Sequence, residues 1–258
     1  MWSRIIRLLV GRRQTAGRTE APSGASRHLA PRGRILVAAA LLLASCRQVP
    51  DEPRFPTAHR DVAPIVGDSF STEDARDRLG EAEEVIQLAG VAPGMSVADI
   101  GAGEGYYTTR LAPVVGRQGR VLAEDIVRQV TDRLAQRVQR ESLDNVAVKL
   151  GDPDDPKLPP RSFDRIFLVH VYHEVESPYE FMWRLRDGLK DGGEVIVVDA
   201  DRPPRRHGMP PRLLQCEFES VGLKMVRLEQ ITGGEAYFAA FRIDGPRPEP
   251  SQIKACRG

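Results

Sequence analysis

The sequence predicts an α/β protein in which a mostly parallel sheet is covered by helices on both faces. From about residue 71 onward, short apolar segments typical of buried strands alternate with segments of helical periodicity. A glycine-rich loop directly follows the first strand, and only five residues separate the last two strands. The alternation predicts parallel pairing, and the short final connection predicts an antiparallel hairpin at the end of the sheet.

The helices are predicted from caps, glycine stops and apolar residues three or four positions apart. The first begins after Ser71 or Thr72 and ends at Gly90. A capping box at Ser177 predicts a helix that starts at Pro178 and runs to Gly192. The other helices are expected over 105–114, 126–141 and 211–221. Strands are expected over 96–100, 120–125, 147–150, 165–171, 194–199, 223–230 and 236–243.

Charge is distributed unevenly along the 258 residues. Residues 1–50 hold nine Arg and one Glu, a net charge of +8, so the remaining 208 residues carry −7. A basic N-terminal segment followed by an acidic remainder is not typical of a nucleic-acid-binding protein. The three cysteines are widely spaced, which argues against a disulfide framework and against a CxxC-type zinc site.

The basic N-terminal segment, residues 1–50, has the features of a targeting segment. Arg32 and Arg34 precede the apolar run 35–43, which is shorter than the roughly 20 residues that a membrane-spanning helix needs. The segment LASC that follows resembles the lipobox of bacterial lipoproteins. That resemblance implies a lipid on Cys46 and attachment to a membrane, and Arg47 at the next position favours the outer membrane. The alternative is a buried helix with an incidental cysteine.

Four regions are therefore expected along the chain. Residues 1–46 form the targeting segment, and residues 47–70, with four prolines, form a flexible linker. Residues 71–243 form the folded domain, and the proline-rich residues 244–258 form a disordered tail. In this reading the domain lies on the periplasmic side of the cell envelope; without export it would be cytoplasmic.

The glycine loop reads DIGAGEG over 99–105. Its spacing is GxGxG, not the GxGxxG of dinucleotide sites, and Glu104 would repel a pyrophosphate at the helix N-terminus. S-adenosylmethionine carries a sulfonium and an ammonium, so Asp99 and Glu104 suit it. The alternative is that both acids only complement the helix dipole.

Acidic residues also end the next two strands. Glu124 and Asp125 end the second strand, where an acid can accept both ribose hydroxyls, or Asp125 can cap the following helix. Asp152 follows the third strand, where it can accept the adenine amino group or act only as a turn residue.

Four segments in this order resemble motifs of the class I S-adenosylmethionine-dependent methyltransferases: VADIGAGEGYYTTRLA, GRVLAEDI, LGDPDDPKLPPRSFDRIFLVHVYHEV and LKDGGEVIVVD. The resemblance spans roughly residues 73–243. It implies a Rossmann-like three-layer sandwich with seven strands, the last antiparallel, and S-adenosylmethionine as cofactor. It also implies that the cofactor is bound by Asp99, Gly101, Ala102, Gly103, Gly105, Glu124, Asp125, Ile126 and Asp152.

In this family the end of the fourth strand borders the transferred methyl group. Here it holds His170, His173 and Glu174, which can take a proton from an acceptor or only cap the strand end. No third ligand with metal-site spacing is visible, so no metal is expected. The segment 199–207 is either a wall of the acceptor pocket or a solvated loop. The signature of nucleic-acid methyltransferases is absent, so a small-molecule acceptor is expected.

Two functions of different class follow. The first is methyl transfer to a small molecule, and the second is a non-catalytic envelope protein that kept the fold and binds a ligand. A nicotinamide-dependent oxidoreductase is disfavoured by the glycine spacing. Export would separate the domain from the cytoplasm, where S-adenosylmethionine is made.

Overall fold

The computed structural model describes residues 54–65, 73–232 and 234–257. These residues belong to one compact unit, Pro50–Gly258. The predictions for the targeting segment 1–46, including Cys46, concern residues outside the described part. Among the helices that the structure describes, none combines the length and hydropathy needed to cross a lipid bilayer.

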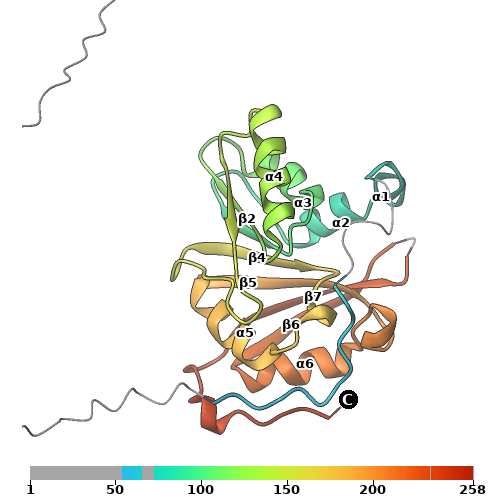
Figure 1. Ribbon diagram of the computed structural model, residues 1–258, viewed down its shortest axis with the longest axis vertical. Helices are drawn as coiled ribbons and strands as arrows, with labels where there is room; N and C mark the ends of the chain where they lie inside the picture. Colours follow the sequence, from blue (N-terminus) through green and yellow to red (C-terminus); the bar gives the residue numbers. More distant parts are fainter. Residues whose placement is uncertain (1–53, 66–72, 233, 258) are drawn as a thin grey trace, which may run out of the picture. The chain divides into compact units, whose positions relative to one another are not determined.

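Seven strands form one sheet in the order β3-β2-β1-β4-β5-β7-β6 (Figure 1). Neighbouring strands from β3 through β5 pair in parallel, and β7 pairs antiparallel with both β5 and β6. This arrangement confirms the predicted fold class and the terminal hairpin. The strands are β1 Ser96–Ile100, β2 Arg120–Asp125, β3 Val146–Leu150, β4 Phe163–Val169, β5 Leu189–Ala200, β6 Leu223–Gln230 and β7 Ala236–Ile243.

The central strands are apolar throughout because helices cover both faces of the sheet. Val97, Phe167 and Ile196 face a core shared with α2 and α3, whereas Ile166 and Val197 face a core shared with α5 and α6. In Figure 1 the helices α1 to α4 lie in the upper half of the view, and α5 and α6 lie in the lower half, near β6. The helices are α1 Glu73–Leu79, α2 Glu81–Leu88, α3 Tyr106–Val115, α4 Arg128–Arg140, α5 Pro178–Leu185 and α6 Pro211–Ser220.

Two helices differ from the prediction. The first is split into α1 and α2 at Gly80, whose φ of 69° is the left-handed conformation that glycine adopts readily. The expected capping box at Ser177 does not form, and α5 ends at Leu185. Leu189 instead begins β5, where it pairs with Phe163 of β4. Pairing in the sheet therefore outweighs the helical spacing of the leucines.

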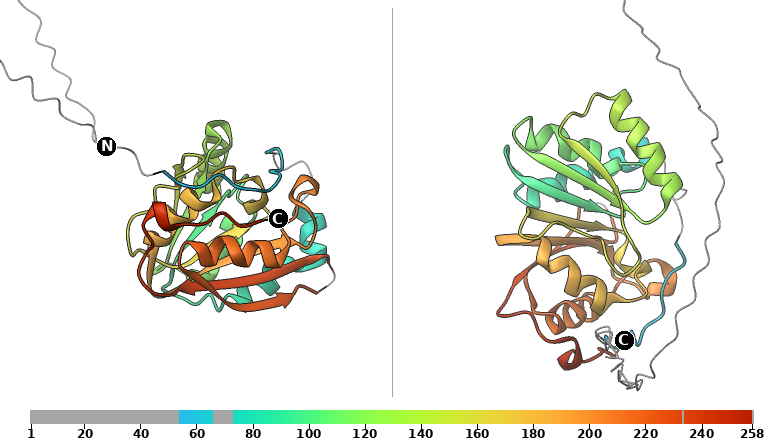
Figure 2. Two further views of the ribbon diagram at one scale, coloured as in Figure 1. Left: turned by 90° about the horizontal axis from the view of Figure 1, so that it is seen from below. Right: turned by 60° about the vertical axis from the view of Figure 1, so that its left-hand side comes forward.

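The segments expected to be a flexible linker and a disordered tail are ordered where the structure describes them. Residues 54–65 and 246–257 lie side by side below α6 (Figures 1 and 2), and His59 and Arg257 form a bridge between them. Phe55 packs edge-on against Trp183, and the Trp183 indole donates to the carbonyl of Pro248. Ile253 is buried in the core of the α5–α6 face. Proline content therefore marks extended, packed backbone here.

The cysteine prediction also needs correction. Cys216 of α6 and Cys256 of the C-terminal segment form a disulfide, with 6.0 Å between their Cα atoms. The backbone N–H of Cys256 donates to the Tyr179 hydroxyl, 2.6 Å away and buried. Wide spacing in the sequence excluded a framework of several bridges but not this single one, because α6 and the chain's last residues meet only in the folded state.

Candidate active site at the carboxyl edge of the sheet

The glycine loop leaves β1 and turns into α3 with three left-handed glycines. Gly101 has a φ of 67°, and a Cβ placed on it would lie 2.5 Å from Cγ2 of Val171. Gly105 has a φ of 91°, and a Cβ there would lie 2.4 Å from Cδ1 of Leu134 in α4. Only glycine therefore fits both positions, and the loop backbone packs directly against the segment that follows β4.

Asp99 lies at the end of β1 beneath this loop and is buried. It accepts a hydrogen bond of 2.6 Å from the Thr108 hydroxyl, which belongs to the first turn of α3. Burial raises the pKa of Asp99 to about 6, although the Thr108 hydrogen bond acts in the opposite direction. The carboxylate is thus fixed in place at the position where the resemblance puts the methionine part of the cofactor.

Asp125 and Glu124 take different roles at the end of β2. The Asp125 carboxylate accepts from the backbone N–H of Gly103 at 3.0 Å and from that of Val127 at 2.8 Å, so it braces the glycine loop against the start of α4. Glu124 is buried against Gly151, and its Oε1 has no hydrogen-bond partner among the described residues. Burial, followed by the charge of Asp125, raises the pKa of Glu124 to about 8.

Four other residues near the loop have distinct surroundings. Ala102 is buried beside Leu134, and its N–H donates to the carbonyl of Glu124 at 2.9 Å, while Ile126 lies half-buried just before α4. Asp152 forms an ion pair with Lys157. Glu104, which the charge argument placed near the cofactor, pairs with Arg133 at the surface, 3.1 Å away. Asp152 and Glu104 therefore face basic side chains in this structure.

The three candidates beyond β4 lie close together but contact different partners. His170, with a φ of 54°, places its Nε2 3.0 Å from Oε2 of Glu81 in α2. His173 is buried, and its Nδ1 lies 2.9 Å from Oδ2 of Asp199 at the end of β5. Glu174 ends the same short 3-10 turn as His173.

The structure adds residues to this region that the sequence reasoning missed or left open. Glu81 and Thr108 carry no local signal, because they reach the site from helices α2 and α3. Asp199 and His207 belong to the segment considered either a pocket wall or a solvated loop. Both face His173: Asp199 through the contact above, and His207 through a ring contact with centroids 5.5 Å apart. The end of β5 therefore lies beside the turn where an acceptor is expected.

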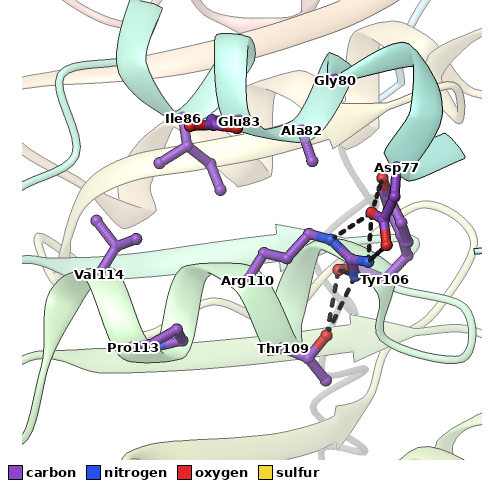
Figure 3. Close-up of a pocket in the computed structure, with 10 residues that line it drawn as sticks. All are labelled: Asp77, Gly80, Ala82, Glu83, Ile86, Tyr106, Thr109, Arg110, Pro113 and Val114. Atoms are coloured by element: carbon purple, nitrogen blue, oxygen red, sulfur yellow. Dashed lines mark hydrogen bonds and ion pairs between the residues drawn. The ribbon is translucent and has the colours of Figure 1, made fainter. Parts of the chain in front are cut away.

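A cavity of about 430 Å³ lies elsewhere, between α2 and α3 (Figure 3). Arg110 spans it, and its guanidinium donates to Asp77 of α1 and to the carbonyl of Tyr106. The residues that line it are Asp77, Gly80, Ala82, Glu83, Ile86, Tyr106, Thr109, Arg110, Pro113 and Val114. None of the predicted site residues is among them.

The chain has the fold of the class I S-adenosylmethionine-dependent methyltransferases, as shown by its strand order, its glycine loop and the acids that end β1 and β2. Its cofactor is therefore S-adenosylmethionine. The chain belongs to the protein-L-isoaspartate(D-aspartate) O-methyltransferase (PCMT) family, whose model matches residues 66–202.

Curated relatives include two kinds of methyltransferase. A ubiquinone/menaquinone biosynthesis C-methyltransferase of Teredinibacter turnerae is 30% identical over 122 residues, which cover 46% of this chain and 48% of that protein. A protein-L-isoaspartate O-methyltransferase of Thermotoga maritima is 32% identical over 114 residues, which cover 43% of this chain and 33% of that protein. The chain spans about half the length, or less, of these relatives.

Solved structures agree on the fold. A methyltransferase from Aquifex aeolicus matches with a TM-score of 0.58 and 23% identity, covering 66% of this chain and 97% of that one. The cyclase SpnF matches with the same TM-score and 16% identity, covering 74% of this chain and 89% of that one. At these identities the likeness concerns the fold alone, and a fold does not by itself determine the reaction.

Proposed function

We propose that this protein transfers a methyl group from S-adenosylmethionine to a small-molecule acceptor bound beyond the end of β4. The contact between Gly101 and Val171 carries the proposal. It supports the proposal because the glycine loop, the expected cofactor site, lies against the segment that bears His170, His173 and Glu174. A methyl donor on the loop and an acceptor beside this segment would then be neighbours.

The residues at the end of β1 and β2 fit the cofactor. Gly101 and Gly105 let the loop adopt left-handed turns and pack closely against Val171 and Leu134, which fixes the backbone that would hold the cofactor. Asp99 offers a buried carboxylate near the expected position of the ammonium group. Oε1 of Glu124 is a buried acceptor without a partner among the described residues, as a ribose hydroxyl would require. S-adenosylmethionine supplies a methyl group on a sulfonium, which is a good leaving group.

The acceptor region can orient the acceptor and hold a proton. His173 is fixed by Asp199, so its Nδ1 carries the hydrogen and its Nε2 is the ring atom able to receive a proton. His170 is fixed in the same way through Nε2 by Glu81, which leaves its Nδ1 for the acceptor. Alignment of the two reacting groups can itself supply several kcal/mol of the rate acceleration.

The acceptor class is inferred from the chain and its relatives together. The relatives named above act, by their names, on isoaspartyl protein residues and on quinone precursors. The family model favours a protein carboxylate as the second candidate acceptor. The absence of a nucleic-acid methyltransferase signature in the sequence supports a small molecule.

We also propose that the domain works in the cell envelope, attached to a membrane through a lipid on Cys46. The lipobox-like LASC supports export, and so does the disulfide between Cys216 and Cys256, because disulfides persist mainly in oxidising compartments. Export away from the cytoplasm is also the observation that favours the second function, a non-catalytic envelope protein that binds a ligand in this fold.

Titration of the purified full chain with S-adenosylmethionine tests the proposal. We expect binding in the wild type and a loss of at least about tenfold in Asp99→Asn and Asp125→Asn, with Asp144→Asn, an exposed acid outside the site, as the matched control. Release of S-adenosylhomocysteine with quinol, thiol or isoaspartyl peptide acceptors then identifies the acceptor class. A folded chain that does not bind the cofactor would overturn the methyltransferase proposal, and binding without turnover on any acceptor would favour the binding protein.

A further inference from the structure

Three potential metal ligands converge beside the acceptor region. The ligand atoms of His173, Glu174 and His207 all lie within 4.8 Å of one another. His173 and Glu174 come from the turn after β4, whereas His207 comes from the segment after β5 and has a left-handed φ of 54°. The spacing of the sequence showed no third ligand, because His207 approaches only when β5 lies beside β4.

The side chain of His173 is oriented as metal-binding histidines are. Its Nδ1 lies 2.9 and 3.1 Å from the two oxygens of Asp199, which is completely buried. Because a carboxylate only accepts hydrogen bonds, Nδ1 carries the hydrogen and Nε2 keeps its lone pair. A carboxylate behind a histidine fixes the ring, sets its tautomer and raises its basicity as a ligand.

The two imidazole rings are also arranged as ligands of one ion. Their centroids are 5.5 Å apart and their planes are nearly perpendicular, at 84°. Two imidazoles on one tetrahedral zinc ion, with Zn–N distances of about 2.0–2.1 Å, have centroids roughly 5 Å apart. Bringing the three ligand atoms onto one ion therefore requires movements of roughly 1 Å.

We propose that His173, Glu174 and His207 bind one divalent transition-metal ion, and that Zn²⁺ suits this donor set best. Two histidines and one carboxylate are a known catalytic zinc donor set, and three protein ligands leave a position for a fourth, non-protein ligand. Asp199 acts as a positioning residue through His173. The site differs from the expected cofactor site, because its ligands follow β4 and β5, whereas the expected cofactor residues lie at or just beyond the ends of β1, β2 and β3.

The site extends the proposed function in one respect. A hydroxyl or thiol of the methyl acceptor is a suitable fourth ligand, because a metal ion lowers the pKa of a coordinated group and so prepares its lone pair for alkylation. This extension rests on the proposed function, whereas the metal site itself does not. With Nε2 of His173 on the ion, His170 is the histidine that stays able to take the acceptor's proton.

Metal titration of the chelator-treated full chain tests the site. With Zn²⁺ in a calorimeter we expect one ion per chain. His207→Ala and Glu174→Gln should each weaken binding at least tenfold, and Asp199→Asn should weaken it about 10- to 100-fold. His59→Ala, which removes an exposed histidine far along the chain from the cluster, is the matched control and should bind as the wild type does. Co²⁺ in place of Zn²⁺ should give visible absorption that is lost in His207→Ala.

Two outcomes would overturn the metal site: no stoichiometric binding, or binding that survives in His207→Ala. Because His173 is buried, substitution there could unfold the chain, so the test relies on His207 and Glu174, whose variants should melt as the metal-free wild type does. Titration of the same variants with S-adenosylmethionine separates the two proposals. Loss of zinc binding with intact S-adenosylmethionine binding bears on the metal site alone. Loss of S-adenosylmethionine binding with intact zinc binding bears on the methyltransferase proposal alone.

Discussion

Arg60 and Glu217, which lie 157 positions apart, form an ion pair that is almost completely shielded from solvent. Nε of Arg60 lies 3.0 Å from Oε1 of Glu217, and the two side chains are 2% and 1% exposed. The Tyr172 hydroxyl donates to the same carboxylate, and Arg60 donates to the carbonyls of Tyr172 and Val175. The pair therefore joins residues 54–65 to α6 and to the turn that carries His173.

Removing one partner of this pair should destabilise the fold strongly. We expect Arg60→Ala to lower the free energy of unfolding by about 3–5 kcal/mol, because it leaves the buried carboxylate of Glu217 without a cationic partner. Urea unfolding measures the loss. Arg205→Ala is the control, since Arg205 pairs with Asp61 at the surface and should have little effect. Equal effects of the two substitutions would contradict the structure.

Reduction of the disulfide should also destabilise the protein. Cys216 and Cys256 close a loop of 40 residues, for which the chain-entropy estimate is about 4 kcal/mol. Urea unfolding with and without a reductant measures the difference, and Cys216→Ser with Cys256→Ser should show no further effect of the reductant. Thiol counting in denaturant should find two more reactive thiols after reduction. An unchanged count would mean that the disulfide does not form.

Gly101→Ala should damage the cofactor loop more than an alanine at a comparable glycine. Both Gly101 and Gly94 have a positive φ, but a Cβ on Gly94 meets nothing within 4 Å, whereas one on Gly101 meets Val171. We expect Gly101→Ala to weaken S-adenosylmethionine binding at least tenfold and Gly94→Ala to leave it unchanged. The cofactor dissociation constants of the two variants decide. Similar constants would show that the Gly101–Val171 contact does not shape the site.

Glu124 should make the stability of the cofactor-free protein depend on pH. Because the pKa of Glu124 is raised from 4.5 to about 8 by burial, the folded chain retains a proton that the unfolded chain releases between these values. Stability should therefore fall as pH rises through this range. Glu124→Gln removes the effect, so its melting temperature should exceed that of the wild type by more at pH 8 than at pH 5.

A gain of about 1 kcal/mol at pH 8 corresponds to a rise of roughly 2–4 °C in Tm for a domain of this size. Glu83→Gln, at an exposed position, is the control and should shift the melting temperature equally at both pH values. A Glu124→Gln variant that is less stable than the wild type at pH 8 would mean that the carboxylate is ionised and satisfied in the folded state.

Much of the fold is encoded in local patterns. The bounds of β1, β2, β6 and β7 were predictable because each is a short apolar or alternating run between clear turn signals. The glycine loop was predictable because the glycines and acids that define it lie within seven consecutive residues. The end of α5 was not, since Leu185 and Leu189 suit a helix as well as the start of a strand, and only pairing with Phe163 decides between them.

The remaining features of the site arise from contacts between distant segments. Local composition does not distinguish a proline-rich tail that packs from one that does not; Ile253 and Cys256 are buried because α5 and α6 lie above them. The contact of Asp199 and His207 with His173 depends on β5 lying beside β4. The resemblance predicted which strand ends would form the site, but it gave no indication of which side chains meet there.

The position of β7 also bears on the order in which this chain can fold. β7 is the last strand of the sequence, yet it lies between β5 and β6, and within the described sheet β6 pairs only with β7. β6 therefore reaches the sheet only through β7, either after β7 has paired with β5 or together with β7 as a hairpin. Val226 and Leu228 of β6 are about half exposed in the folded protein. Before β6 pairs with β7, they lie on a strand whose backbone is unpaired. We expect assembly of this edge to be the late, rate-limiting event in folding, since it depends on long-range pairing.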